Sequence, residues 1–202
     1  MIKIQIFIAL LFFGFRSHAD TLGGGLFLEP AFTYQNGTLK VQYPVPFLSD
    51  SNENINGYGL GLRAGAHFAD ILFLAADIRY AQPNYESTAL NGSAKAQALD
   101  YGLTIGLQTP FFGIRLWNTF ILDGSLNPDT INSVDIEYKG LNGYRIGGGL
   151  YIAIVSLNLE YQEAKYKSTN VQSAGPFAPG ALDNVNGTEK NIIFSVSFPL
   201  AL

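Results

Sequence analysis

Eight charged residues have the types and spacing for ion-pair chemistry. They lie on one face of segments in which apolar and polar residues alternate: Glu29, Asp77, Asp100, Glu160, Arg63, Arg79, Arg115 and Arg145. Carboxylate and guanidinium groups form paired hydrogen bonds, and enclosed charges need such partners. We expect these residues to form Arg–carboxylate pairs with a structural role inside the folded protein, and we call them the lumen charge network. A charge-pair gate or a path for small ions is the alternative interpretation.

One histidine raises the possibility of nucleophilic catalysis. His67 lies on the same face as Ser156 and Ser197, but a hydroxyl nucleophile needs a base within hydrogen-bond reach and a third group that orients the base. No acidic residue is suitably placed to orient His67. We therefore expect no enzyme activity and no catalytic residues.

Other chemistries have weaker support. The chain has no cysteine, which excludes disulfides, thiolate nucleophiles and Cys-ligated metals. The alternating glycines of residues 57–61 are not followed by the helix pattern that a nucleotide-binding loop needs. Asp50 and Glu53 could bind calcium only weakly. We expect no cofactor and no metal.

Eight segments with a strict period of two must position these side chains. One face carries Leu, Ile, Val, Phe and Tyr, and the other carries Gly, small polar residues and charges, as strands do and helices do not. The predicted strands are residues 23–35, 56–68, 71–82, 97–108, 112–123, 143–152, 154–166 and 189–199. Their connections alternate between tight turns and long polar loops at 36–54, 83–96, 124–142 and 167–188.

Six tyrosines share the apolar face and the long-loop end of their segments. They are Tyr34, Tyr58, Tyr80, Tyr101, Tyr144 and Tyr161. A phenol ring can rest at the hydrocarbon edge with its hydroxyl among the headgroups. These tyrosines are predicted to form a membrane-interface girdle.

The first nineteen residues have the pattern of a secretory signal peptide. Lys3 precedes an apolar run over residues 4–15, and residues 17–19 place small side chains at the cleavage positions. The predicted division is a signal peptide over 1–19 and one barrel domain over 20–202.

The chain that remains after the leader has ten basic and sixteen acidic residues, a net charge of −6, so we expect no nucleic-acid partner.

The balance of side-chain sizes indicates which face is outside. The apolar face has too many large side chains for the interior of an eight-stranded barrel, whereas the glycine-rich polar face suits a narrow lumen. Strands that are apolar outside and polar inside are the form in which a barrel spans a bilayer. The soluble alternatives are a lipocalin-like barrel and a β-sandwich.

The leader, the eight alternating segments, the tyrosines and the alternation of short and long connections resemble the small eight-stranded outer-membrane proteins, the group of OmpX, OmpW and the OmpA membrane domain. The resemblance implies an all-β, eight-stranded antiparallel transmembrane β-barrel with short periplasmic turns, four long extracellular loops and both termini in the periplasm. Unlike these proteins, which usually end on an aromatic residue, the chain continues four residues beyond Phe198.

The expected function is a structural or surface-interaction role in the bacterial outer membrane, with a plugged, charge-paired lumen. The alternative is a minor channel for ions or small apolar solutes, and a lipid A-modifying barrel enzyme has less support. The expected partners are outer-membrane lipid and lipopolysaccharide, the barrel-assembly machinery during biogenesis, and a surface ligand contacted through the long loops.

Overall fold

The computed structural model describes residues 25–43, 50–68, 71–109, 113–152, 154–176 and 185–202. The predicted leader lies outside these residues, and no helix among them is long and apolar enough to span a bilayer. The described elements are strands: β1 (Leu26–Gln42), β2 (Ser51–Phe68), β3 (Leu72–Ser87), β4 (Gly92–Gln108), β5 (Ile114–Pro128), β6 (Val134–Lys139), β7 (Asn142–Ile152), β8 (Val155–Tyr166), β9 (Ser168–Ala174), β10 (Asn186–Ser197) and β11 (Leu200–Ala201).

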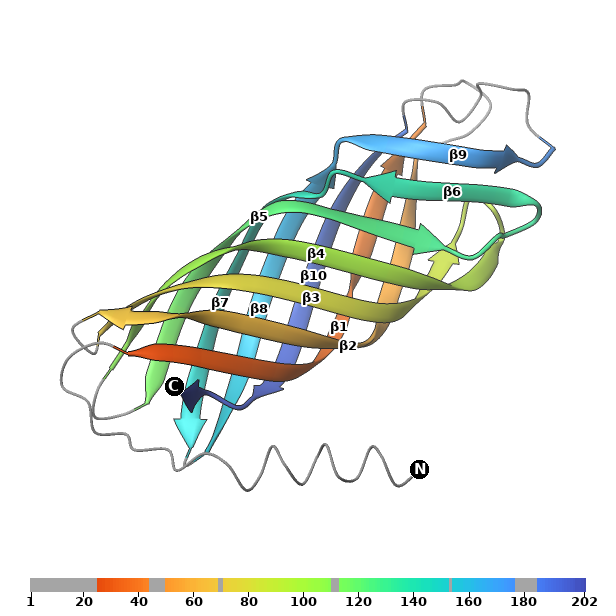
Figure 1. The fold of residues 1–202 in the computed structure, drawn as a ribbon. Helices are drawn as coiled ribbons and strands as arrows, with labels where there is room; N and C mark the ends of the chain where they lie inside the picture. Colours follow the sequence, from red (N-terminus) through yellow and green to blue (C-terminus); the bar gives the residue numbers. More distant parts are fainter. Residues whose placement is uncertain (1–24, 44–49, 69–70, 110–112, 153, 177–184) are drawn as a thin grey trace, which may run out of the picture.

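Eight strands form a closed antiparallel barrel (Figure 1). From neighbour to neighbour the order is β4, β3, β2, β1, β10, β8, β7 and β5, and the pairing of β4 with β5 closes the ring. Closure leaves no unpaired edge around the barrel wall, as a sheet in hydrocarbon requires. The predicted all-β, eight-stranded antiparallel barrel is confirmed.

Two further strands extend one end of the molecule. β6 pairs with β9, and it is joined to the barrel through its pairing with β5. Figure 1 shows both strands at the upper right. We call this end, where β3 also turns into β4, the long-connection end. The short-turn end is the opposite end, where β2 turns into β3.

The barrel strands run further towards the long-connection end than the sequence predicts. β1 continues to Gln42, β3 continues to Ser87, and β4 already begins at Gly92. The added residues of these strands lie in segments that the sequence predicts as loops. Their alternation is regular, but the apolar side chains occupy the inner face instead of the outer face. The predicted strands therefore end too early, because they are defined by apolar residues at outer positions. We call the part of the molecule beyond the six tyrosines, including β6 and β9, the extension.

A β-bulge keeps the apolar side chains of β5 on the inner face of the barrel. Tyr101 of β4 pairs with Asp123, but the next residue, Gly102, pairs with Ile121, so β5 has one extra residue at this point. A bulge of this kind shifts the phase of the alternation. Both Ile121 before the bulge and Leu126 after it are consequently buried, although their numbers differ in parity.

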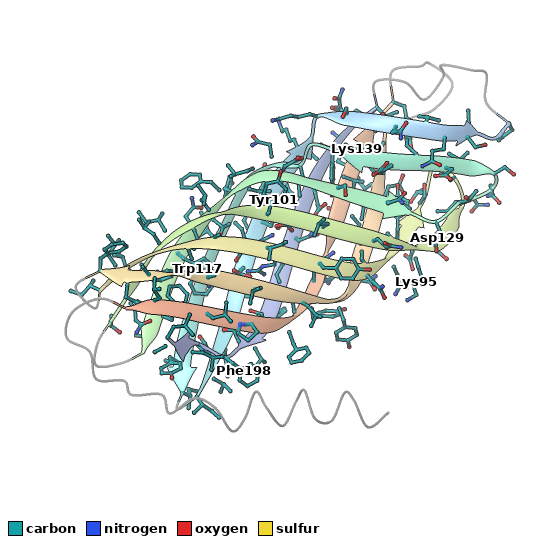
Figure 2. All side chains as sticks on the ribbon, viewed as in Figure 1. Lys95, Tyr101, Trp117, Asp129, Lys139 and Phe198 are labelled. Atoms are coloured by element: carbon teal, nitrogen blue, oxygen red, sulfur yellow. The ribbon has the colours of Figure 1, made fainter. Side chains whose placement is uncertain are left out.

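An apolar belt surrounds the barrel between the short-turn end and the level of the six tyrosines. Phe32 is 65% exposed, Leu116 is 60% exposed and Leu103 is 55% exposed. Figure 2 shows side chains projecting from the outer surface of the sheet. So continuous an exposed apolar surface is unfavourable in water and matches the hydrocarbon of a bilayer.

Candidate functional site

All eight predicted charges lie on the inner face of the barrel, at the level of the apolar belt. They come from seven strands: Glu29 from β1, Arg63 from β2, Asp77 and Arg79 from β3, Asp100 from β4, Arg115 from β5, Arg145 from β7 and Glu160 from β8. The side chain of Asp100 is 15% exposed, and the other seven are at most 10% exposed. Strand alternation thus brings together charges that are distant in the sequence.

Glu29 forms the pair nearest the short-turn end. Its two carboxylate oxygens accept hydrogen bonds of 2.9 and 2.8 Å from Nη1 and Nη2 of Arg115. Ser197 Oγ donates a third hydrogen bond at 2.6 Å. Arg63 approaches the same carboxylate at 3.7 Å. The geometry is that of a bidentate pair, which fixes both side chains.

Asp77 is the centre of the network because three guanidinium groups meet at its carboxylate. Arg63 lies 3.1 Å away, Arg79 donates at 3.1 Å from Nε, and Arg145 donates at 3.0 Å from Nη1. Asp100 accepts two bonds from Arg145 Nη2, at 2.8 and 2.9 Å. Arg145 therefore bridges two carboxylates.

Glu160 links the network to the only tryptophan of the chain. It accepts hydrogen bonds of 2.6 and 2.9 Å from Arg79. Trp117 Nε1 donates to the same carboxylate at 2.8 Å. Figure 2 labels Trp117. The tryptophan lies on the predicted inner face, but nothing in the sequence indicated this hydrogen bond.

The network balances four positive against four negative side chains, all of which are at most 15% exposed. Removing charges from water is costly, and only close pairing with further hydrogen bonds compensates for that cost. The contacts above provide such pairing for each carboxylate. Deleting a single member would leave an uncompensated charge inside the barrel.

An aromatic cluster adjoins the charge network, with Phe27 and Phe73 towards the short-turn end and Trp117 among the charges, where Arg63 lies 4.9 Å from its ring centre. Phe27, Phe73, Ala75 and Trp117 form one buried group. The guanidinium carbon of Arg115 lies 5.0 Å from the centre of the Phe73 ring and 5.8 Å from that of Trp117. These distances allow cation–π attraction.

Glycine makes room for the largest of these rings. A Cβ atom added at Gly147 would overlap the ring of Trp117. Gly106 has the same relation to the ring of Phe73. At these two positions glycine is therefore explained by the close approach of a large lumen side chain.

An apolar core fills the lumen on the other side of the charge network, towards the long-connection end. Its buried members are Leu39, Val41, Ile55, Tyr85, Leu90, Ala96, Ile121, Leu126, Ile131, Val134, Ile136, Tyr138, Leu141, Ala164, Tyr166 and Val185. The hydroxyl groups of Tyr85 and Tyr138 are hydrogen-bonded at 3.1 Å, so even these polar atoms are satisfied within the core.

A small cavity remains at the level of the charges. It has a volume of about 10 Å³, roughly the space that one water molecule needs. Its lining includes Glu29, Arg63, Asp77 and Arg79. The cavity is far smaller than a pocket for an organic ligand.

Two buried carboxylates were missed by the sequence analysis. Glu189 accepts hydrogen bonds from Tyr166, Asn191 and Gln162, and burial raises the pKa of its carboxyl group. Its position in the alternation of the last predicted strand could have revealed it. Glu53 lies before the second predicted strand, where the inner face could not be assigned.

Glu53 belongs to the extension, and its environment differs from that of Asp50. It is buried and accepts hydrogen bonds from Ser51 Oγ and the Thr88 N–H, whereas Asp50 is exposed. Burial and the charge of Glu53 raise the pKa of Tyr43 to about 12. The described residues contain no group of three or more His, Cys, Asp or Glu side chains that could hold a metal ion.

The residues considered for catalysis have structural contacts. His67 packs against Phe27, with ring centres 4.6 Å apart. Ser197 donates to Glu29, and Ser156 Oγ donates to Asn158 at 2.8 Å. Both hydroxyl protons are thus engaged, and the serines support the polar lining of the barrel.

The six girdle tyrosines lie on the outer face, where the apolar belt ends. Tyr58 is 76% exposed and packs against Tyr34 with ring centres 5.0 Å apart. The hydroxyl of Tyr101 donates to Asp123, and those of Tyr144 and Tyr161 both donate to Glu163. The rings therefore border apolar side chains while three of the hydroxyls contact carboxylates.

The chain is similar to solved outer-membrane proteins in fold. OprG from Pseudomonas aeruginosa has a TM-score of 0.54 and 12% identity, with 91% of this chain and 99% of OprG covered. Neisserial surface protein A gives 0.47 and 13%, with 86% and 98% covered, and Ail of Yersinia pestis gives 0.44 and 10%, with 87% and 99% covered.

The similarity is structural and not one of sequence. No protein-family model matches the chain, and no curated protein matches it. The likeness to OprG nevertheless covers nearly all of both chains. The resemblance to small eight-stranded outer-membrane barrels is confirmed at the level of fold.

Proposed function

We propose that the protein is an outer-membrane β-barrel with a closed lumen, whose long-connection end presents an interaction surface outside the cell. The role is structural or adhesive. The barrel fold and its apolar belt support a location in the bacterial outer membrane, because closed barrels with such belts are how strands cross a bilayer.

The observation that carries this proposal is the filling of the lumen at three successive levels. Phe27 and Phe73 lie nearest the short-turn end, the charge network with Trp117 follows, and the apolar core lies beyond it. A channel needs a continuous path for its solute. The cavity among the charges holds about one water molecule.

The outer surface of the extension supports a role in contacts with other molecules. Beyond the tyrosines, outward positions carry polar side chains such as Asn52, Asn54, Thr38 and Gln82, all of which are exposed. A surface of this kind is stable in water and can contact a ligand. Lipid and lipopolysaccharide around the belt, and the assembly machinery during biogenesis, remain the other partners that we propose.

Conductance in planar bilayers tests closure directly. The wild-type protein should give no discrete conductance steps. Arg63→Ala and Arg145→Ala should also give none if they fold, because the apolar core and the aromatic cluster remain in place. Steps in the wild type would support the alternative minor channel, and steps in the variants alone would identify the charge network as a gate.

Epitope insertion tests which end faces outwards. An epitope placed after Asn91, in the turn between β3 and β4, should bind antibody on intact cells. The same epitope in the turn between β2 and β3 should bind only after permeabilisation. The reverse pattern would contradict the proposed orientation.

A non-catalytic role is part of the proposal. Its support is that the lumen carboxylates are engaged by arginines and that Ser156 and Ser197 are engaged by neighbouring side chains. The mass spectrum of lipid A from expressing cells should be unchanged. A new lipid A species that disappears in Ser197→Ala would contradict this part.

A further inference from the structure

Lysines gather on one wall of the barrel. Five of the six lysines that follow the leader lie on β1, β6, β8 and β10 or on the residue that joins β8 to β9: Lys40, Lys139, Lys165, Lys167 and Lys190. The sixth, Lys95, lies on β4, which is on the opposite side of the ring from β10. The lysines are thus distributed unevenly around the molecule.

The strand register places three of these lysines close together. Lys165 of β8 and Lys40 of β1 both face Thr188 of β10, from its two sides. Two strand spacings separate them, about 10 Å. Lys190 is two residues along β10 from Thr188 and therefore points to the same side of the sheet. We call Lys40, Lys165 and Lys190 the lysine triad.

The triad carries three positive charges, of which a neighbouring carboxylate offsets one. Lys190 lies 3.5 Å from Glu163, which also accepts hydrogen bonds from Tyr144 and Tyr161. Lys40 and Lys165 are exposed. In the part of the chain that the structure describes, neither of them has a carboxylate within 4 Å.

The triad lies just beyond the end of the apolar belt. Lys190 is two residues from Ile192, which is 49% exposed, and Lys165 is four residues from Tyr161. At the usual rise and tilt of barrel strands these separations are about 5 and 10 Å in height. The headgroup layer is roughly 5–8 Å thick, and lysine side chains can bend towards it.

We propose that the lysine triad binds the phosphate-bearing headgroup of a membrane lipid whose acyl chains lie on the belt below it. The outer surface of β8 and β10 there is apolar, with Leu159 and Phe194 both more than half exposed. A ligand that combines acyl chains with phosphate matches both surfaces. This inference rests on the proposed function, because it places the long-connection end in the headgroup region of the outer leaflet.

Native mass spectrometry of the full barrel in detergent tests the proposal with diphosphoryl lipid A as the probe. The triple variant Lys40→Gln, Lys165→Gln, Lys190→Gln should bind lipid A about 10- to 100-fold more weakly, since each lysine near a lipid surface contributes roughly a five-fold factor. Lys95→Gln should bind as the wild type does. The triple Lys→Arg variant should retain binding.

Dephosphorylated lipid A and inorganic phosphate separate the possible sources of affinity. The dephosphorylated lipid should bind the wild type and the triple Gln variant equally weakly. Equal binding of both lipids by the wild type would overturn the proposal, as would phosphate alone binding as tightly as lipid A. Because these variants change only exposed side chains, heat-modifiability on gels should stay normal. The epitope and conductance tests report separately on orientation and closure.

Discussion

The belt level of the barrel and the extension have opposite side-chain polarity on their inner and outer faces, although the same strands run through both. On β1 at the belt level, Glu29 points inwards and Phe32 points outwards with 65% of its surface exposed. Further along the same strand, Leu39 points inwards and is fully buried, while Lys40 is exposed. The alternation is uninterrupted, yet the polarity of both faces has exchanged.

The exchange shows that each face is selected by what surrounds it. β3 repeats the pattern, with Arg79 inside and Ile78 outside at the belt level, then Tyr85 inside and Glu86 outside in the extension. In the proposed membrane location, lipid around the belt would require apolar outer residues and leave charges for the lumen. Water around the extension allows polar outer residues and favours an apolar core. The six tyrosines lie where the polarity of the two faces exchanges.

The largest predicted effect comes from breaking the charge network at Arg145. Arg145→Ala removes the cation shared by Asp77 and Asp100 and leaves their charges inside the barrel. The free energy of unfolding should fall by about 3–5 kcal/mol. Urea titration in lipid vesicles measures this loss. An unchanged midpoint would show that the pairs contribute nothing to stability.

A matched pair of arginine substitutions tests the outer faces. Leu103→Arg places a charge in the hydrocarbon layer and should cost about 2–4 kcal/mol. Thr38→Arg places the same charge on the outer face of the extension and should cost less than about 0.5 kcal/mol. Equal costs in the same vesicle titration would contradict the division into a belt and an extension.

The inner face of the extension is tested by Leu39→Ala. The side chain is fully buried in the apolar core, and its truncation should cost about 2–5 kcal/mol for lost burial and a cavity. Its effect should appear first as faster hydrogen exchange in the extension, with the belt level unchanged. Uniform acceleration over the whole barrel would mean that the two regions unfold together.

The smallest predicted effect concerns pH. Because burial raises the pKa of Glu189, the folded protein binds this proton more tightly than the unfolded chain does. Glu189 therefore favours folding at low pH, and stability should fall as the pH rises above the ordinary carboxyl value of 4.5. Glu189→Gln should reduce this slope. A slope identical to that of the wild type would contradict the assignment.

The sequence was sufficient for the barrel and for the inward position of the charges because both follow from a period of two. The partners of individual charges could not be predicted, since Arg79 and Glu160 come from strands that meet only across the lumen. The extension was not predicted because its outer positions are polar, which gives these strand segments a composition typical of loops. The bulge at Asp123 has no local sequence signal that we can identify.

The most direct test of the account uses spin labels, since the chain has no cysteine of its own and single cysteines can be introduced cleanly. Labels at Leu103 and Leu157 should collide with oxygen dissolved in the bilayer, and labels at Thr38 and Gln82 should collide with a water-soluble nickel complex. Water accessibility at Leu103 and Leu157 in reconstituted vesicles would contradict the central claim that polarity is exchanged at the tyrosines.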